Sequence, residues 1–141
     1  MLSREHNPNI LVVDDEPFIV RYVQQVLQRA NYRVLTATNA EEAWSIFERR
    51  RTRIDLLLTD VVMPGLMDGL ELAAKIRRFE PTFPILLITG AIFSSDPRAM
   101  EIKEDLLRKP FSPKQLIDFV GAQFARESPI FQRPSGQVRT L

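Results

Sequence analysis

The sequence predicts a doubly wound α/β domain, in which a parallel sheet carries helices on both faces. Short apolar runs of strand length alternate five times with segments of helical periodicity. The apolar runs are continuous, as expected for strands that are buried on both faces of a parallel sheet. The connections have about the length of a helix, which suits right-handed crossovers between parallel strands.

The first two strands and helices are predicted from apolar runs and helix-start signals. Residues 10–13 form an apolar strand, and the helix after it starts at Pro17, whose missing N–H costs nothing in the first turn. A second strand is predicted over residues 32–36. Asn39, followed by Glu42 three residues later, then marks the start of a second helix.

The third strand and helix are the best-defined unit of the chain. The apolar run 56–58 ends abruptly at a threonine and Asp60, and Pro64 with Gly65 prevents regular structure after them. Helical periodicity resumes near Leu70. We therefore expect Asp60 on a strand-to-helix loop at the carboxyl edge of the sheet, where open α/β sheets bind their ligands.

The last part of the chain is predicted less regularly. Residues 85–88 form a fourth strand, and residues 105–108 form a weak fifth strand. Between them, residues 94–103 can hold at most a short helix, capped by Ser95 or Asp96. A final helix with an apolar stripe follows the fifth strand.

Length and composition limit the remaining possibilities. The 141 residues suit one domain, and the absence of cysteine excludes disulfides, thiol catalysis and thiolate metal sites. No apolar run reaches the length of a membrane span, the start lacks a signal-peptide core, and the net charge is only +1 with scattered basic residues. We expect a soluble, cytoplasmic protein with no membrane association and no direct nucleic-acid binding. A disordered lead (1–8), one domain (9–125) and a flexible tail (126–141) are predicted.

Polar side chains stand at the predicted ends of four strands. Because these ends meet at one edge of a parallel sheet, side chains far apart in the sequence come together there. The set comprises three carboxylates, one hydroxyl and one ammonium: Asp14, Asp15, Asp60, Thr89 and Lys109. Clustered carboxylates repel one another unless they share protons or a cation, and Mg²⁺ prefers such oxygen ligands. Lys109 and Thr89 can hold a phosphoryl group while Asp60 attacks as a carboxylate nucleophile.

Other α/β proteins use related chemistry with different patterns. A phosphohydrolase of the haloacid-dehalogenase type places Asp-x-Asp directly after its first strand, whereas Asp60 follows the third. A flavin- or nucleotide-binding module needs a Gly-rich or hydroxyl-rich first loop, and the acidic loop at residues 14–16 would repel phosphate unless a metal intervened. Each polar residue alone also has an ordinary structural explanation, as a cap, a strand former or a turn. Only their joint placement favours a functional site.

Four motifs resemble the receiver domain of two-component response regulators. They are Leu-Val-Val-Asp-Asp-Glu-Pro at 11–17, Asp-Val-Val-Met-Pro-Gly at 60–65 with Met-Asp-Gly-Leu-Glu-Leu at 67–72, Ile-Thr-Gly at 88–90, and Lys-Pro-Phe-Ser-Pro at 109–113. The resemblance implies a flavodoxin-like (βα)5 fold of three layers with strand order 2-1-3-4-5. The fourth helix is expected to be short or irregular.

The resemblance also implies the roles of the acidic residues. Asp60 is the expected phosphoacceptor, supplied by a histidine kinase, a phosphotransfer protein or a small phosphodonor. Asp15, Asp60 and the main-chain carbonyl of Val62 are expected to bind Mg²⁺, with Asp14 assisting through a water molecule. Such a receiver takes part in its own phosphorylation and dephosphorylation without being a separate enzyme.

The remaining motif residues are expected to act on the phosphoryl group. By the resemblance, Lys109 and Thr89 hold it, and the peptide bond between Lys109 and Pro110 is cis. Receivers tune dephosphorylation through residues two past the acceptor and two past the Thr. These are Val62 and Ala91, both apolar, so we expect slow self-dephosphorylation.

Three features depart from the family pattern. Leu106 stands where receivers often carry an aromatic residue that moves with the Thr, Leu66 lengthens the loop after Asp60, and the fourth helix is reduced. This pattern is similar to receivers of hybrid histidine kinases and of single-domain regulators. We expect a stand-alone receiver that signals by altered binding to a downstream protein, or as a homodimer. The alternative is a receiver-like interaction module that no longer cycles phosphate.

Overall fold

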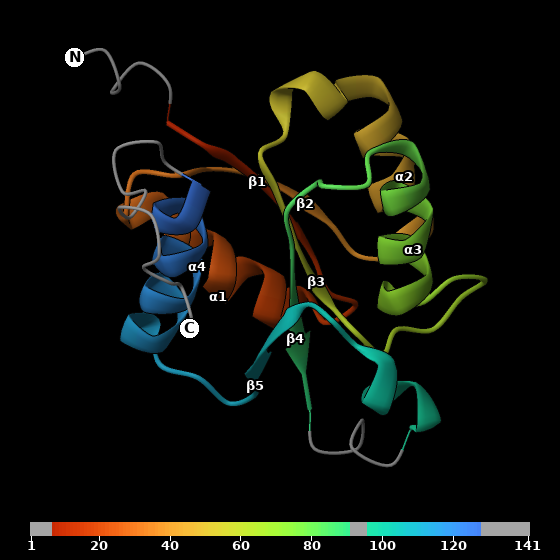
Figure 1. Ribbon diagram of the computed structural model, residues 1–141. Helices are drawn as coiled ribbons and strands as arrows, with labels where there is room; N and C mark the ends of the chain where they lie inside the picture. Colours follow the sequence, from red (N-terminus) through yellow and green to blue (C-terminus); the bar gives the residue numbers. More distant parts are fainter. Residues whose placement is uncertain (1–6, 91–95, 128–141) are drawn as a thin grey trace, which may run out of the picture.

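The computed structural model describes residues 7–90 and 96–127, which form five parallel strands between two layers of helices (Figure 1). Helices α1 and α4 cover one face of the sheet, and α2 and α3 cover the other. The strand order is β2-β1-β3-β4-β5, as predicted. The strands are β1 (Asn9–Val13), β2 (Arg33–Ala37), β3 (Leu56–Asp60), β4 (Ile85–Thr89) and β5 (Asp105–Arg108). The helices are α1 (Pro17–Arg29), α2 (Ala40–Arg50), α3 (Gly69–Phe79) and α4 (Pro113–Glu127), with short 3-10 helices η2 (Arg51–Arg53) and η4 (Pro97–Glu101).

The start of β2 differs from the prediction by one residue. Asn31 adopts a left-handed backbone conformation with φ 73°, which ends the turn after α1. The N–H of Tyr32 still bonds back to the carbonyl of Leu27 at 3.1 Å, so Tyr32 belongs to the connection. The ladder with β1 therefore begins at Arg33.

Two elements extend further than predicted. Asp60 is the last residue of β3 rather than part of the following loop, because the ladder with β4 includes Asp60 and continues through Val61, whose N–H bonds the carbonyl of Ile88 at 2.9 Å. Helix α4 continues through Glu127, two residues beyond the predicted end of the domain. None of the helices within the described ranges is long and apolar enough to cross a membrane.

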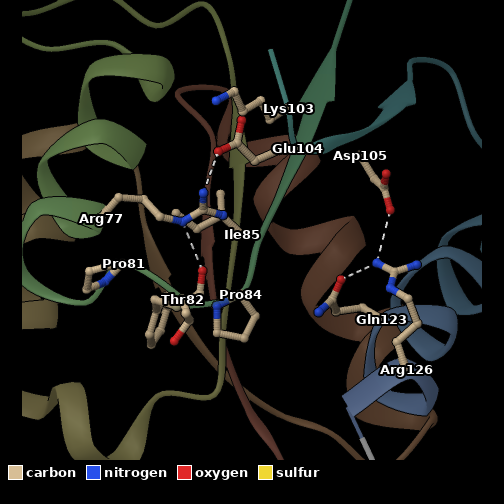
Figure 2. Close-up of a pocket in the computed structure, with 11 residues that line it drawn as sticks. Arg77, Pro81, Thr82, Pro84, Ile85, Lys103, Glu104, Asp105, Gln123 and Arg126 are labelled. Atoms are coloured by element: carbon tan, nitrogen blue, oxygen red, sulfur yellow. Dashed lines mark hydrogen bonds and ion pairs between the residues drawn. The ribbon is translucent and has the colours of Figure 1, made fainter. Parts of the chain in front are cut away.

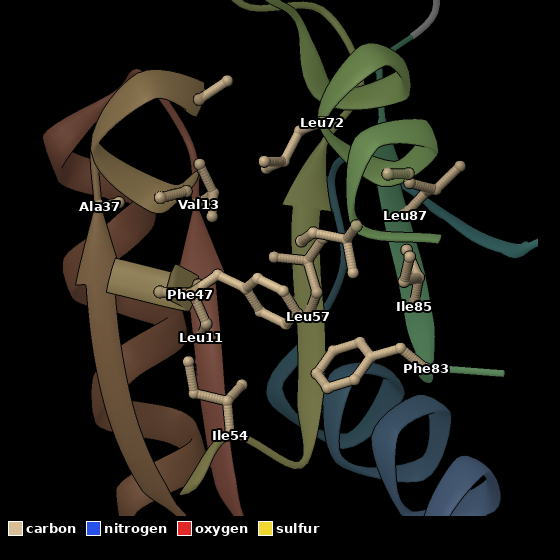
Figure 3. Packing of buried hydrophobic residues seen from close by; sticks show 14 of the residues in the cluster. Leu11, Val13, Ala37, Phe47, Ile54, Leu57, Leu72, Phe83, Ile85 and Leu87 are labelled. Carbon is tan, nitrogen blue, oxygen red and sulfur yellow. The ribbon is translucent and has the colours of Figure 1, made fainter. Parts of the chain in front are cut away.

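Apolar side chains fill both sides of the sheet. On the side of α2 and α3, the ring of Phe47 packs edge-on against Phe83, with 5.2 Å between centroids, and both lie near Leu57 (Figure 3). Leu56 and Leu58, the neighbours of Leu57 along β3, point into the second cluster, beside α1 and α4. Each fully buried side chain of this size stabilises the fold by about 1.5 to 3 kcal/mol. Packing on both faces thus holds the carboxyl end of β3 in place.

The reduced fourth helix is confirmed. Residues Pro97–Glu101 form only a 3-10 helix, and its cap is Asp96, whose side chain accepts a hydrogen bond from the N–H of Arg98 at 2.8 Å. Ala99 and Ile102 attach η4 to the α2/α3 side of the core. Ala91 and Ser95, which the sequence analysis singled out, lie outside the described residues.

Helix α3 begins in close contact with the end of β3. Asp68 and Glu71 form a capping box, in which each side chain accepts a hydrogen bond from the other residue's N–H, at 3.0 and 2.9 Å. The N–H of Gly69 bonds the carbonyl of Val61 at 2.9 Å. A Cβ atom on Gly69 would lie 1.9 Å from the carbonyl oxygen of Asp60. Only glycine allows α3 to start here.

We predict that Gly69→Ala destabilises the protein by roughly 1 to 3 kcal/mol or more, because the added methyl group must push α3 away from β3. The matched control is Gly121→Ala in α4, where a Cβ atom meets nothing within 4 Å. That change should leave stability unchanged or raise it by up to about 1 kcal/mol through helix propensity. Urea unfolding followed by circular dichroism measures both effects. Equal midpoints for the two variants would contradict the close approach.

Candidate functional site

Polar side chains are buried at one edge of the sheet. Within the described residues, the buried polar or charged side chains are those of Asp14, Thr59, Asp60 and Thr89. Each stands at, or next to, the carboxyl end of a strand. Burying a carboxylate is costly unless charge and hydrogen bonds compensate, so a group of them in one place marks a candidate functional site.

Backbone hydrogen bonds hold the strand ends in register. The N–H of Val61, just after Asp60, bonds the carbonyl of Ile88 on β4. One strand further, the N–H of Lys109 bonds the carbonyl of Thr89 at 2.8 Å. Asp60 and Thr89 therefore end two neighbouring strands and Lys109 directly follows the third, so the three residues meet at one edge, as the sequence predicted.

Lys109 joins two of the carboxylates. Its Nζ atom lies 3.1 Å from Oδ2 of Asp14 and 3.6 Å from Oδ2 of Asp60. Asp14 directly follows β1 and Asp60 ends β3, and these two strands are adjacent in the sheet. A single ammonium group thus bridges residues that are 46 positions apart in the sequence.

The loop after Lys109 is attached to α1. The peptide bond between Lys109 and Pro110 is cis, as expected. The hydroxyl of Tyr22 donates to the carbonyl of Phe111 at 3.1 Å, and the two rings lie 6.0 Å apart between centroids. This contact fixes the chain that follows the lysine.

Three carboxylates lie close enough to hold one metal ion. Asp14, Asp15 and Asp60 each offer an oxygen atom, and these atoms lie within 4.8 Å of one another. Oδ1 of Asp14 accepts a hydrogen bond from the N–H of Glu16 at 3.0 Å. Val62, the expected main-chain ligand, lies two residues past Asp60, and its side chain is 53% exposed. A set made only of oxygen donors with a net negative charge suits a hard divalent cation.

The pKa values show that the negative charges are not fully compensated. Burial, followed by the nearby charge of Asp14, raises the pKa of Asp60 to about 7 although Lys109 opposes the shift. Burial also raises the pKa of Asp14, against its hydrogen bond from Glu16 and its contact with Lys109. Burial alone would lower the pKa of Lys109, but the carboxylates of Asp60 and Asp14 outweigh it and raise this pKa. A bound cation would favour the ionised carboxylates.

Two neighbouring features were not predicted. Asp68 was not identified as the cap of the third helix, although Asp-x-x-Glu before an apolar run is a capping-box signal. Arg98 was not singled out, yet its Nη2 atom lies 2.8 Å from Oδ2 of Asp68. No local pattern predicts this contact, because the two residues are 30 positions apart.

A cavity of about 310 Å³ lies at the opposite end of the sheet (Figure 2). Ile85 and Asp105, the first residues of β4 and β5, form part of its lining. Both guanidinium groups there are paired: Arg77 Nη1 lies 3.1 Å from Glu104 Oε2, and Arg126 Nη2 lies 3.0 Å from Asp105 Oδ2. None of the predicted site residues lines this cavity. We therefore assign the chemistry to the carboxyl edge.

The raised pKa of Asp60 predicts a specific dependence of stability on pH. Its ordinary value of 3.8 applies to the unfolded chain and about 7 to the folded protein, so the folded state binds more protons between these pH values. Stability should therefore fall as pH rises from about 4 to about 7. The asparagine in Asp60→Asn does not ionise, so this variant does not lose stability as the pH rises. We expect its free energy of unfolding to exceed that of the wild type by roughly 1 to 3 kcal/mol at about pH 8 and to differ little below about pH 4.

Urea unfolding in a chelating buffer at several pH values measures this difference. Asp55→Asn is the matched control, because Asp55 is an exposed carboxylate just before the other end of β3. A gap between wild type and Asp60→Asn that does not change with pH would contradict the assignment.

Comparison with known proteins places this geometry in a family. Residues 10–121 match the family described as the response regulator receiver domain. The chain is 39% identical over 135 residues to the alkaline phosphatase synthesis transcriptional regulatory protein PhoP of Bacillus subtilis, covering 94% of this chain and 54% of that protein. It is 34% identical over 124 residues to the phosphate regulon transcriptional regulatory protein PhoB of Pseudomonas aeruginosa, covering 85% and 53%. The chain spans about half the length of these relatives.

Solved structures agree with this match. A response regulator receiver domain protein from Clostridium thermocellum superposes with a TM-score of 0.77 at 28% identity, covering 85% of this chain and 96% of that one. The receiver domain of the hybrid histidine kinase CckA has a TM-score of 0.68 at 35% identity, covering 82% and 97%. The sequence match, the five-stranded parallel sheet and its order all agree, and the chain belongs to the family of response regulator receiver domains of two-component systems.

Proposed function

We propose that Asp60 accepts a phosphoryl group in a Mg²⁺-dependent reaction. The observation that carries this proposal is the environment of Asp60, which is 5% exposed, lies 3.6 Å from the ammonium of Lys109 and lies within 4.8 Å of two other carboxylates. A carboxylate with only a structural role has no need of two like charges beside it. A nucleophile that shares a cation with its neighbours does.

In the proposed reaction, a carboxylate oxygen of Asp60 attacks the phosphorus of a phosphohistidine donor. The new O–P bond forms while the N–P bond to the donor breaks, and its electron pair leaves with the imidazole. Asp14, Asp15, Asp60 and the main-chain carbonyl of Val62 are the residues that would hold Mg²⁺. When bound, this ion offsets the negative charge shared by the donor and the acceptor. With a pKa of about 7, Asp60 is partly protonated at neutral pH, so a cation also increases the reactive ionised fraction.

Lys109 and Thr89 are the proposed phosphoryl-binding groups. The ammonium of Lys109 lies between Asp14 and Asp60, so it is close enough to bind an oxygen of a phosphoryl group on Asp60. The hydroxyl of Thr89, on the adjacent strand, donates to the carbonyl of Gly90 at 3.1 Å and must turn to bond a phosphoryl oxygen. Phosphorylation would therefore change contacts on both β4 and β5.

A histidine kinase or a phosphotransfer protein is the proposed donor. We infer that the output is altered binding to a downstream protein or to a second copy of the chain, without direct contact to nucleic acid. The alternative, a receiver-like module that does not cycle phosphate, is favoured only by Leu106 in place of an aromatic residue and by the reduced η4. Both differences affect how a signal would leave the site, while the acceptor and its neighbours are all present.

We predict that acetyl phosphate with Mg²⁺ adds one phosphoryl group to the protein. Intact mass spectrometry should show a gain of roughly 80 Da, which is absent in Asp60→Asn and in a chelating buffer. The change at Asp60 removes the nucleophile, and the chelator removes the cation that makes the clustered carboxylates reactive.

The matched control for this measurement is Asp55→Asn. Asp55 lies at the other end of the sheet, where its side chain accepts a hydrogen bond from the N–H of Asn9 at 2.8 Å. The Asp55→Asn variant should therefore gain the phosphoryl group at Asp60 as the wild type does. Labelling of Asp60→Asn at the wild-type rate would place the acceptor elsewhere. No labelling of the wild type by acetyl phosphate or by a kinase would favour the phosphate-independent module.

We predict that Val62→Asn shortens the lifetime of the phosphorylated protein. Val62 is apolar and its side chain is 53% exposed, two residues past Asp60. An amide at this position can orient a water molecule for attack on phosphorus, which valine cannot. The loss of the mass adduct over time measures the lifetime, with Val62→Ala as the control that lacks the polar group. A lifetime for Val62→Asn equal to or longer than that of Val62→Ala would contradict the idea.

A further inference from the structure

Arg98 connects η4 to the start of α3. Its Nη2 atom lies 2.8 Å from Oδ2 of Asp68 and 2.8 Å from Oδ2 of Asp96, while its Nε donates to Oδ1 of Asp96 at 3.2 Å. Asp96 is the N-cap of η4, two residues before Arg98, so the contact between Arg98 and Asp96 is local. Asp68 belongs to a different part of the chain, which makes the Arg98–Asp68 pair the long-range contact. The pair is only partly exposed, at 41% for Arg98 and 18% for Asp68.

Asp68 is connected to Asp60 through the next residue along the chain. It forms the N-cap of α3, and the next residue, Gly69, bonds the carbonyl of Val61 and packs against the carbonyl of Asp60. The loop enclosed between Val61 and Asp68 carries Val62, whose main-chain carbonyl is the proposed metal ligand. The ion pair at Asp68 is thus at one end of the loop that carries this carbonyl, and the Val61–Gly69 hydrogen bond closes the loop.

The middle of this loop has few anchors of its own. Gly65 has a positive φ of 117°, and Leu66, the residue that lengthens the loop, is 92% exposed. Met63 is buried and Met67 packs at the edge of the core. The anchors of the loop include these two apolar contacts, the hydrogen bonds of Val61 with Ile88 and Gly69, the capping box and Arg98.

We propose that Arg98 is a positioning residue for the Asp60 site. Through Asp68 it holds the loop that carries Val62, and it links occupancy of the site to the order of η4. The part of this proposal that concerns metal and phosphoryl binding rests on the proposed function. Because a coupling free energy acts equally in both directions, a cation that orders the loop must also order η4. This contact offers a link between the site and η4 that does not use residue 106, which is leucine here.

Three variants isolate the ion pair. Arg98→Met removes the charge but keeps a long apolar side chain. Asp68→Asn removes the charge but keeps a good N-cap, since asparagine caps helices as well as aspartate does. Asp96→Asn is the matched control, because it alters the local partner of Arg98 and leaves the pair with Asp68 in place.

The first measurement needs neither metal nor phosphoryl transfer. Amide hydrogen exchange by NMR reports on the N–H groups of Gly69 and Glu71, whose hydrogen bonds close the start of α3. Exchange should be roughly two- to fivefold faster in Arg98→Met and in Asp68→Asn, the size expected for a partly exposed ion pair. The double variant should be no faster than either single one. Asp96→Asn should match the wild type at these two amides.

The second measurement is the Mg²⁺ concentration that gives half the maximal rate of labelling by acetyl phosphate. It should rise roughly two- to fivefold in Arg98→Met, while the rate at saturating Mg²⁺ stays within about twofold of the wild type. Arg98→Lys should restore part of the affinity, because lysine supplies the charge without the planar fork. Mg²⁺ should also slow exchange at the N–H of Ala99 in η4 in the wild type and not in Arg98→Met.

The outcomes separate this proposal from the proposed function. If the wild type is labelled and Arg98→Met shows unchanged amide exchange and unchanged Mg²⁺ dependence, the positioning role is wrong and the phosphoacceptor stands. If the wild type is not labelled, the proposed function fails, and amide exchange with a calorimetric Mg²⁺ titration still decides the role of Arg98. A broad loss of stability in Arg98→Met, with equal changes in Asp96→Asn, would overturn the specific role of the Asp68 contact.

Discussion

The arrangement of this domain depends on one electrostatic imbalance. Three carboxylates, two from the loop after β1 and one from the end of β3, meet at one edge of the sheet, and the ammonium of Lys109 bridges two of them. Burial and then the nearby charge of Asp14 raise the pKa of Asp60 to about 7, because the single positive charge of Lys109 does not offset both effects. The packed strands and the short contact at Gly69 keep these groups together against their repulsion. A divalent cation would relieve the imbalance, which supports the reaction proposed at Asp60.

Much of the fold could be predicted from the sequence because its signals are local. Continuous apolar runs such as 56–58 identify strands that are buried on both faces. Asn39 with Glu42 marks a helix start, and the structure confirms it: the N–H of Glu42 donates to Oδ1 of Asn39 at 2.7 Å, and the N–H of Thr38 donates to Oε1 of Glu42 at 2.9 Å. The errors lie at the element ends. Tyr32 was predicted to start a strand because aromatic residues favour strands. In the structure its ring stacks on Phe124 of α4, and its N–H completes the turn after α1. Tertiary contacts of this kind leave no mark in a short window of sequence.

The site was predictable for a different reason. In a parallel sheet, topology alone brings the carboxyl ends of β1, β3, β4 and β5 to one edge, so residues such as Asp14, Asp60 and Lys109 meet wherever the loops run. The contacts around that site do not follow from topology. The Asp68–Arg98 pair depends on the path of η4. The close approach of Gly69 to β3, where an added Cβ atom would lie 1.9 Å from the carbonyl oxygen of Asp60, depends on the depth at which α3 packs. Both require coordinates.

The two apolar clusters have a mechanical consequence. Ala99 and Ile102 attach η4 to the cluster under α2 and α3, whereas Phe111, just past Lys109, packs into the cluster under α1 and α4. The sheet separates the two clusters. The carboxyl edge that carries Asp60 is in contact with residues connected to each of them. The Asp60 edge is therefore connected to both layers, to η4 through Asp68 and Arg98 and to α1 through Tyr22 and the loop after Lys109. A partner protein that binds one layer of helices would leave the connection between the site and the other layer uncovered.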